Sequence, residues 1–260
     1  MLTNHTLAAA RVSAFALSLF FLACQPQNQV KQNSEMPKKM IWAWERPEDL
    51  RFLDPKEFGV AFLAQTLFLE KDRVDQKARR QPLEIAEGAY VIAVTRIESK
   101  SDGFSRSSSF RTPKGVDLTN NVVDLVKRTL DLPNVKGIQI DFDAVVSERE
   151  FYRELMNKIR KGTPKSVTLT MTSLASWCTG DAWFNDFPVD EAVPMVFVMG
   201  ADTEKVRNYL RNGNDWQEPL CRGSYGISID EPRPENLKPN RRIYFFKNSS
   251  WNAGDLDSLK

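Results

Sequence analysis

Two aspartates on one strand-like segment have the types and the spacing needed for acid–base chemistry. Residues 137–144 read GIQIDFDA, and the alternation puts Gln139, Asp141 and Asp143 on one face of an extended strand and apolar residues on the other. Two neighbouring carboxyl groups cannot both ionise cheaply in a cleft shielded from water, so the pKa of one should rise. A carboxyl group that stays protonated near neutral pH can act as a general acid. We therefore expect Asp143 to be the catalytic acid and Asp141 to be the partner that orients and tunes it.

A structural role is the alternative for these two aspartates. They precede a predicted helix by only a few residues, where acids commonly stabilise the helix N-terminus, and they could also bind arginine in a structural network. Three further acids follow other strand-like segments and are candidates for a second catalytic carboxylate: Glu45, Asp230 and Glu231. Because Arg46 and Arg233 lie beside two of them in the sequence, simple surface ion pairs are the alternative there.

Tryptophans lie close to the same predicted strand ends. The four that we single out as candidates for substrate binding are Trp42, Trp44, Trp177 and Trp251. Their flat apolar faces could stack on sugar rings, although packing in the core is the more common role of any single tryptophan. Acids and indoles at one edge predict a site for a polysaccharide or oligosaccharide.

The composition excludes several other classes of chemistry. The only histidine is His5, which lies in a segment that we expect to be removed. Ser-His-Asp and Cys-His catalysis and the common histidine-bearing zinc and iron sites are therefore excluded, and we expect no cofactor and no metal. The 36 Lys and Arg residues nearly balance the 34 Asp and Glu residues and are interspersed with them, so nucleic acid is not an expected partner.

The N-terminus has the pattern of a lipoprotein signal peptide. An apolar run over residues 12–23 follows Arg11 and is too short to span a bilayer. It ends in Phe-Leu-Ala before Cys24, whose thiol we expect to carry the lipid that anchors the protein to the membrane. Gln25 after the cysteine is typical of lipoproteins sent to the outer membrane, facing the periplasm. A plain secretory signal with an incidental cysteine is the alternative. The expected organisation is a signal peptide over 1–23, a flexible tether over 24–39 and a barrel domain over 40–260.

Two cysteines remain in the expected mature chain, Cys178 and Cys221. In an oxidising compartment such thiols commonly pair, so we expect a disulfide between them. Two buried free thiols are the alternative.

The elements that must position these residues alternate between apolar strand-like runs and amphipathic or loop segments, which favours a parallel sheet covered by helices. Eight strands in about 221 residues fit an α/β fold of the TIM-like (β/α)8 barrel type, with helices short or missing after the second and seventh strands. An open doubly wound sheet is the alternative, but no glycine-rich phosphate loop follows any strand. The predicted strands are 40–44, 59–69, 89–97, 135–142, 166–174, 192–199, 224–230 and 241–247, and the predicted helices are 117–131, 148–161 and 202–212.

The segment GIQIDFDA resembles the fourth-strand motif of the chitinase-like glycoside hydrolases of family 18, which reads DGxDxDxE and ends in the proton donor. In that alignment Asp141 occupies the position of the third acid and Asp143 that of the proton donor. Lys136 and Gln139 occupy the positions of the first two acids. The resemblance implies that Asp143 is the proton donor.

A longer resemblance covers most of the chain after the leader. Residues 42–55, 59–67, 139–155, 172–178 and 188–200 are similar to bacterial domain-of-unknown-function family 3142 (DUF3142), whose members are typically secreted or lipid-anchored. The resemblance implies a glycosidase-like barrel. We therefore expect a lipid-anchored periplasmic barrel, similar to a glycoside hydrolase, that acts on or binds an envelope or imported glycan through carboxylate chemistry. A non-catalytic glycan-binding or envelope-scaffold lipoprotein is the alternative.

Overall fold

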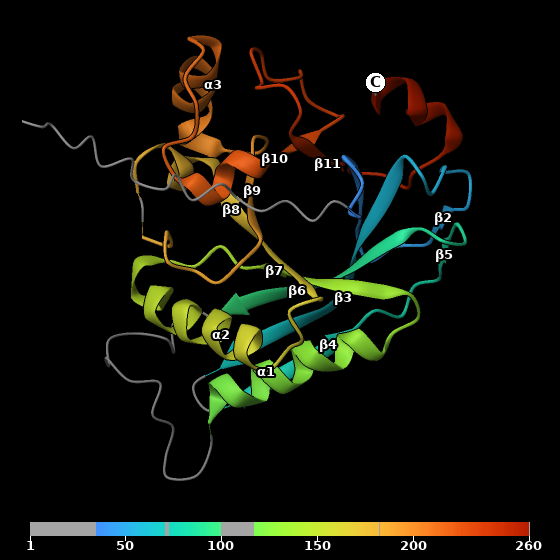
Figure 1. Ribbon diagram of the computed structural model, residues 1–260, viewed down its shortest axis with the longest axis vertical. Coiled ribbons are helices and arrows are strands. Elements are labelled where there is room, and N and C mark those ends of the chain that lie inside the picture. The colour runs from blue at the N-terminus through green and yellow to red at the C-terminus, as the bar shows by residue number, and fades with distance from the viewer. Residues whose placement is uncertain (1–34, 71–72, 100–116, 182, 260) are drawn as a thin grey trace, which may run out of the picture.

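The fold is a closed barrel of eight parallel strands. The computed structural model describes residues 35–70, 73–99, 117–181 and 183–259 (Figure 1). Around the barrel the strands follow the order β1 (Lys39–Ala43), β11 (Arg242–Phe246), β10 (Ser224–Ser228), β9 (Glu191–Met195), β8 (Thr168–Leu174), β7 (Val135–Asp141), β6 (Tyr90–Ser99) and β3 (Phe58–Glu70). Pairing of β1 with β3 closes the ring. The (β/α)8 prediction is confirmed, and each of the eight predicted strands is one of the barrel strands.

Strands replace the helix after the second barrel strand. The chain leaves β3 and returns as β4 (Arg73–Ala78), which pairs with β3 in antiparallel fashion. The short strands β2 (Glu48–Leu50) and β5 (Leu83–Ile85) form a separate parallel pair. In the described part of the chain no helix follows β3 or β10, as the sequence analysis predicts. It does not predict the three short strands, because β4 is mostly polar and exposed and the other two have only three residues each.

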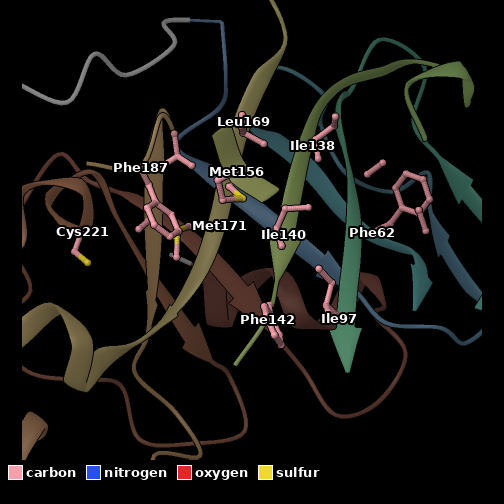
Figure 2. Packing of buried hydrophobic residues seen from close by; sticks show 14 of the residues in the cluster. Phe62, Ile97, Ile138, Ile140, Phe142, Met156, Leu169, Met171, Phe187 and Cys221 are labelled. Carbon is pink, nitrogen blue, oxygen red and sulfur yellow. The ribbon is translucent and has the colours of Figure 1, made fainter. Parts of the chain in front are cut away.

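Helices cover part of the outside of the barrel. Helices α1 (Leu118–Arg128) and α2 (Arg149–Lys161) lie side by side in Figure 1, and α3 (Thr203–Arg211) follows β9. Their buried faces belong to the same apolar cluster as Ile138, Ile140 and Phe142 of the β7 segment. Figure 2 shows these three residues in the packing with Met156 of α2 and Met171 of β8. The outer face of β7 is thus apolar, as its alternation predicts.

The opposite face of β7 points into the barrel. Gln139 is fully buried there, accepts a hydrogen bond of 2.8 Å from Trp42 Nε1 and donates one of 3.1 Å to Thr170 Oγ1. A second apolar cluster fills the interior around them, with Ile92 and Tyr244 among its members. This packing orders the strand whose next inward residue is Asp141.

A buried ion pair lies at the N-terminal end of the barrel. Arg242 Nη1 donates to Glu191 Oε2 at 2.5 Å, and the two side chains are 1% and 3% exposed. Arg242 also donates to the backbone oxygens of Pro37 (2.8 Å) and Met36 (3.2 Å), which fixes the segment that enters β1. Residues 36–39, which the sequence analysis assigns to the tether, therefore belong to the barrel, and Met36 is buried in its interior cluster.

A disulfide links Cys178 and Cys221, with an Sγ–Sγ distance of 2.09 Å, which confirms the predicted pair. It joins the segment after β8 to the segment before β10. The predicted signal peptide and Cys24 lie outside the described residues. Among the residues that the structure describes, no helix has the length and apolar character needed to cross a membrane.

Candidate functional site

A cavity of about 310 Å³ lies at the C-terminal ends of the barrel strands. Polar side chains from β6, β7 and the segments after β7, β8, β9 and β11 face it together with apolar side chains that include the residue directly after β1. Those that matter for its chemistry are Trp44, Arg96, Asp141, Asp143, Phe197, Asp202 and Phe246. In (β/α)8 barrels this end of the strands is where the active site is found. The structure thus brings both aspartates of the GIQIDFDA segment to one cavity.

Asp141 is held firmly and is 3% exposed. Its Oδ2 accepts a hydrogen bond of 2.8 Å from Arg96 Nη1, and its Oδ1 accepts one of 2.7 Å from Thr172 Oγ1. Arg96 reaches over from the neighbouring strand β6 and also pairs with Glu98 at 3.0 Å. Burial lowers the pKa of Arg96. The negative charge of Asp141 and the hydrogen bonds that Arg96 donates to Asp141 and Glu98 outweigh this effect, so the pKa of Arg96 is raised overall. Asp141 is therefore a fixed negative charge at the bottom of the cavity.

Asp143 is the acid that remains available. Its side chain opens onto the cavity, and within the described residues its carboxylate takes part in no hydrogen bond and no ion pair. Asp143 is exposed at the cavity, yet the surrounding protein displaces part of the water near its carboxyl group, and this desolvation is the largest cause of a raised pKa for Asp143. The nearby charge of Asp141 raises this pKa further, and Arg96 opposes the rise. The environment therefore shifts the pKa of Asp143 in the direction that a general acid requires.

Glu45 is engaged elsewhere and does not line this cavity. Its carboxylate binds Lys77 Nζ of β4 at 2.8 Å, and this bond, together with a backbone N–H of Arg80, lowers the pKa of Glu45 despite some desolvation. Its neighbour Arg46 pairs instead with Glu48. The structure therefore does not support Glu45 as the second catalytic carboxylate and makes it part of a surface ion pair.

Asp230 and Glu231 support the rim of the cavity and do not line it. Asp230 Oδ2 accepts a hydrogen bond of 2.6 Å from the backbone N–H of Asn248. Glu231 accepts from the backbone N–H of Val198 at 2.9 Å and pairs with Arg207 at 3.1 Å. Both carboxylates are thus occupied, and the structure gives them a supporting role.

The rim residue Val198 has a strained backbone. Its φ is +47°, a conformation that a β-branched residue rarely adopts, and its side chain is 80% exposed. Such outliers cost about 1–3 kcal/mol and persist where the surroundings impose them, often at functional sites. The hydrogen bond that the backbone N–H of Val198 donates to Glu231 holds this turn beside Phe197.

Asp202 is a second available carboxylate, which the sequence analysis misses. It lies directly before α3 and lines the same cavity as Asp143. No side-chain hydrogen bond caps the helix at Asp202, and no ion pair or hydrogen bond engages its carboxylate among the described residues. The sequence signal was ambiguous because an aspartate at the start of a predicted helix is ordinarily explained as a cap.

Aromatic side chains form one wall of the cavity. The ring centroids of Phe197 and Phe246 lie 4.6 Å apart, and Trp44 lies at the cavity directly after the adjacent strand β1. Trp42 packs behind them, with ring centroids 4.3 Å from Trp44 and 5.2 Å from Phe246. Of the four predicted tryptophans only Trp44 lines the cavity, while Phe197 and Phe246 were not singled out from the sequence.

The other three predicted tryptophans are packing residues. Trp42 is fully buried beneath the cavity, where it bonds to Gln139. Trp251 is 4% exposed and donates from Nε1 to the backbone oxygen of Trp42 at 3.1 Å. Trp177 lies in a separate aromatic cluster, at 5.1 Å from Trp183. We therefore correct their expected role in substrate binding, because none of them reaches the cavity.

Comparisons with known proteins add little. No protein family model matches the chain, and no curated protein matches it. A solved structure of a GH113 β-1,4-mannanase complex has 9% sequence identity and a TM-score of 0.46, over 86% of this chain and 93% of that one. Within the described residues, no group of three or more His, Cys, Asp or Glu side chains comes together as a possible metal site.

Proposed function

We propose that the barrel binds a neutral glycan in the cavity at its mouth and hydrolyses it, with Asp143 as the general acid. The observation that carries this proposal is the combination of an unpartnered carboxyl group with a raised pKa, a second unpartnered carboxylate and an aromatic wall on one cavity.

Asp143 would protonate the glycosidic oxygen as the bond between that oxygen and the anomeric carbon breaks. Asp202 is the candidate second carboxylate, in place of the three acids that are engaged elsewhere. Such a carboxylate either activates the attacking water or attacks the anomeric carbon itself, and water supplies the new hydroxyl group in both cases. Asp141 would act through its charge, which favours the protonated form of Asp143, while Arg96 and Thr172 keep it in place.

The charge and shape of the cavity support a neutral sugar ligand. Arg96 is the only cation among the described residues that line it, and it is already paired with Asp141 and Glu98. An anionic sugar would therefore meet unpaired carboxylates and no available positive charge. Trp44 and Phe197, which are both half-buried, offer the apolar surface that a pyranose ring can stack on. A volume of about 310 Å³ suits a small ligand or one end of a longer chain.

We further propose that the protein is a lipoprotein of the bacterial envelope and that it belongs to family 3142. The support is the apolar run over residues 12–23, followed by Ala23 and Cys24, and the segments similar to that family. Lipid on Cys24 would anchor the barrel at the periplasmic side of a membrane, with the outer membrane favoured by Gln25.

Turnover of defined oligosaccharides by soluble protein tests the enzymatic part. All contacts described above are made by residues 35–259, so a chain that starts at Gln25 retains the whole described fold. It should be incubated with peptidoglycan fragments, chitin-type oligosaccharides and α- and β-glucan oligosaccharides. Removal of a general acid typically costs about 10²–10⁴-fold in rate, so Asp143→Asn and Asp202→Asn should lose turnover. Glu45→Gln is the matched control, because that acid lies outside the cavity and its loss should leave turnover unchanged.

Turnover that survives Asp143→Asn would refute the assignment of the acid. Saccharide binding that depends on Trp44, without any product from the wild-type protein, would instead support the non-catalytic alternative. The anchoring proposal is tested separately by the mass of the membrane-extracted protein, which should carry acyl chains that a Cys24→Ala variant lacks.

A further inference from the structure

A second cavity lies at the opposite, N-terminal end of the barrel. Its volume is about 740 Å³, and four cationic side chains line it, Lys38, Lys56, Lys136 and Arg242, against one acid, Glu35. These residues come from the entry segment, from the turn before β3 and from the starts of β7 and β11. The barrel thus carries a concave positive surface at the end that faces away from the proposed active site.

Part of this positive charge has no counter-charge among the residues that the structure describes. Glu191 compensates Arg242 in the barrel interior. Lys56 and Lys136 are exposed, and neither forms an ion pair with any residue that the structure describes. Lys136 Nζ lies over the ring of Tyr90 at 5.5 Å, so this amine is held at the cavity by a group without opposite charge. Lys38 Nζ donates to the backbone oxygen of Asn240 at 2.9 Å.

The cations are close enough to influence one another. Burial lowers the pKa of Lys38, and the charge of Arg242 lowers it further, while Glu191 opposes the change. An added anion would relieve this repulsion. A cavity with such charges therefore favours a negatively charged ligand.

The length of the connecting sequence limits how far Cys24 can lie from this end of the barrel. The bonds from Arg242 to the backbone oxygens of Met36 and Pro37 fix the entry segment across the N-terminal end. Cys24 precedes Glu35 by 11 residues, which can span at most about 40 Å when fully extended. If Cys24 carries lipid, the positive cavity lies within about 40 Å of the bilayer surface. The cavity with Asp143 is at the opposite end of the barrel.

We propose that this cavity and its lysines dock onto anionic phospholipid headgroups of the leaflet that anchors Cys24. The inference rests on the proposed lipid anchor, and it orients the barrel so that the cavity with Asp143 faces away from the membrane. Charge complementarity and the short connection to Cys24 both favour headgroups as the ligand.

Vesicle binding by the unlipidated chain that starts at Gln25 tests this docking directly. Vesicles that mix phosphatidylglycerol with phosphatidylcholine should sediment the protein at low salt, and vesicles of phosphatidylcholine alone should not. Lysines near an anionic surface contribute enough that a Lys56→Gln/Lys136→Gln double variant should bind about 30-fold more weakly. The matched control is Arg80→Gln/Lys205→Gln, which removes the same charge from exposed positions outside this cavity.

Three results would overturn the proposal: equal sedimentation with both kinds of vesicle, equal loss in both double variants, or inorganic phosphate that binds the cavity with the affinity seen for the vesicles. The last result would indicate a site for a small anion. Because the protein in this assay carries no acyl chain and no sugar, its outcome is independent of the mass of Cys24 and of turnover. A failure of docking is therefore distinguishable from a failure of either part of the proposed function.

Discussion

Replacement of Glu191 by glutamine should destabilise the barrel strongly although the two side chains have nearly the same shape. Glu191 accepts from Arg242 Nη1 at 2.5 Å and from the Tyr244 hydroxyl at 2.8 Å, at a position 3% exposed. Glutamine can still accept from Tyr244. It removes the carboxylate charge that faces the buried guanidinium of Arg242, and this is the main cost.

The expected magnitude follows from the burial of both partners. Removal of one member of a buried ion pair typically costs about 3–5 kcal/mol, a large share of the roughly 5–15 kcal/mol that keeps a domain folded. For a chain of this size each kcal/mol lowers Tm by about 2–4 °C, so Glu191→Gln should lower Tm by about 6–20 °C. A second change, Arg242→Met, removes the buried positive charge of the guanidinium. The double variant should therefore recover much of the lost stability, because apolar residues often replace a buried ion pair at little cost.

The assay is urea unfolding of the chain that starts at Gln25, followed by far-ultraviolet circular dichroism in the wild type, both single variants and the double variant. The reasoning is refuted if Glu191→Gln stays within about 1 kcal/mol of the wild type, the scale of an ordinary neutral hydrogen bond. It is also refuted if the effects of the two changes simply add, because the pair would then carry no coupling energy.

Three further predictions concern the site and the disulfide. The raised pKa of Asp143 means that the folded protein binds a proton at this carboxyl group more tightly than the unfolded chain does. The contribution of Asp143 to stability should therefore decrease as pH rises from about 3.8, its ordinary pKa. Asp143→Asn should be more stable than the wild type at neutral pH and equal to it below pH 3.8, as thermal unfolding across pH can measure. Trp44→Ala should weaken saccharide binding with little effect on folding, whereas Trp177→Ala should cost about 3–5 kcal/mol of stability and leave binding intact, as titration calorimetry and unfolding can separate. Replacement of both Cys178 and Cys221 by alanine should cost about 4 kcal/mol in denaturant unfolding, because the disulfide closes a loop with a sequence separation of 43; a loss below 1 kcal/mol would argue against this loop-closure account.

Local alternation was enough to predict much of the barrel and part of its site. The pattern of residues 137–143 fixes which side chains of β7 face the helices and which face the interior, because a strand repeats every two residues. Once this strand lies in a closed parallel barrel, its polar face ends at the mouth. The placement of Asp141 and Asp143 follows from these two steps.

The roles of the tryptophans could not be predicted in the same way. Trp42 lies on β1 and Trp44 follows two residues later, directly after the strand ends. Trp42 is nevertheless buried against Gln139 and Phe246, whereas Trp44 lies at the cavity. The difference depends on how far neighbouring strands extend, which is a property of register between distant segments. Asp202 was missed for a related reason, since only the folded chain shows that its carboxylate does not cap the helix it precedes.

The free edge of strand β4 affects whether two copies of the protein can pair their sheets. Ring closure leaves the eight parallel strands without a free edge, but β4 adds one to the sheet, since among the described residues it pairs only with β3. Its charged side chains are exposed and alternate along the strand: Arg73, Asp75 and Lys77. If two copies paired these edges in antiparallel fashion about Asp75, aspartate would face aspartate and Arg73 would face Lys77. Like charges directly opposite each other destabilise such pairs, so this edge resists polymerisation of the protein into extended sheets.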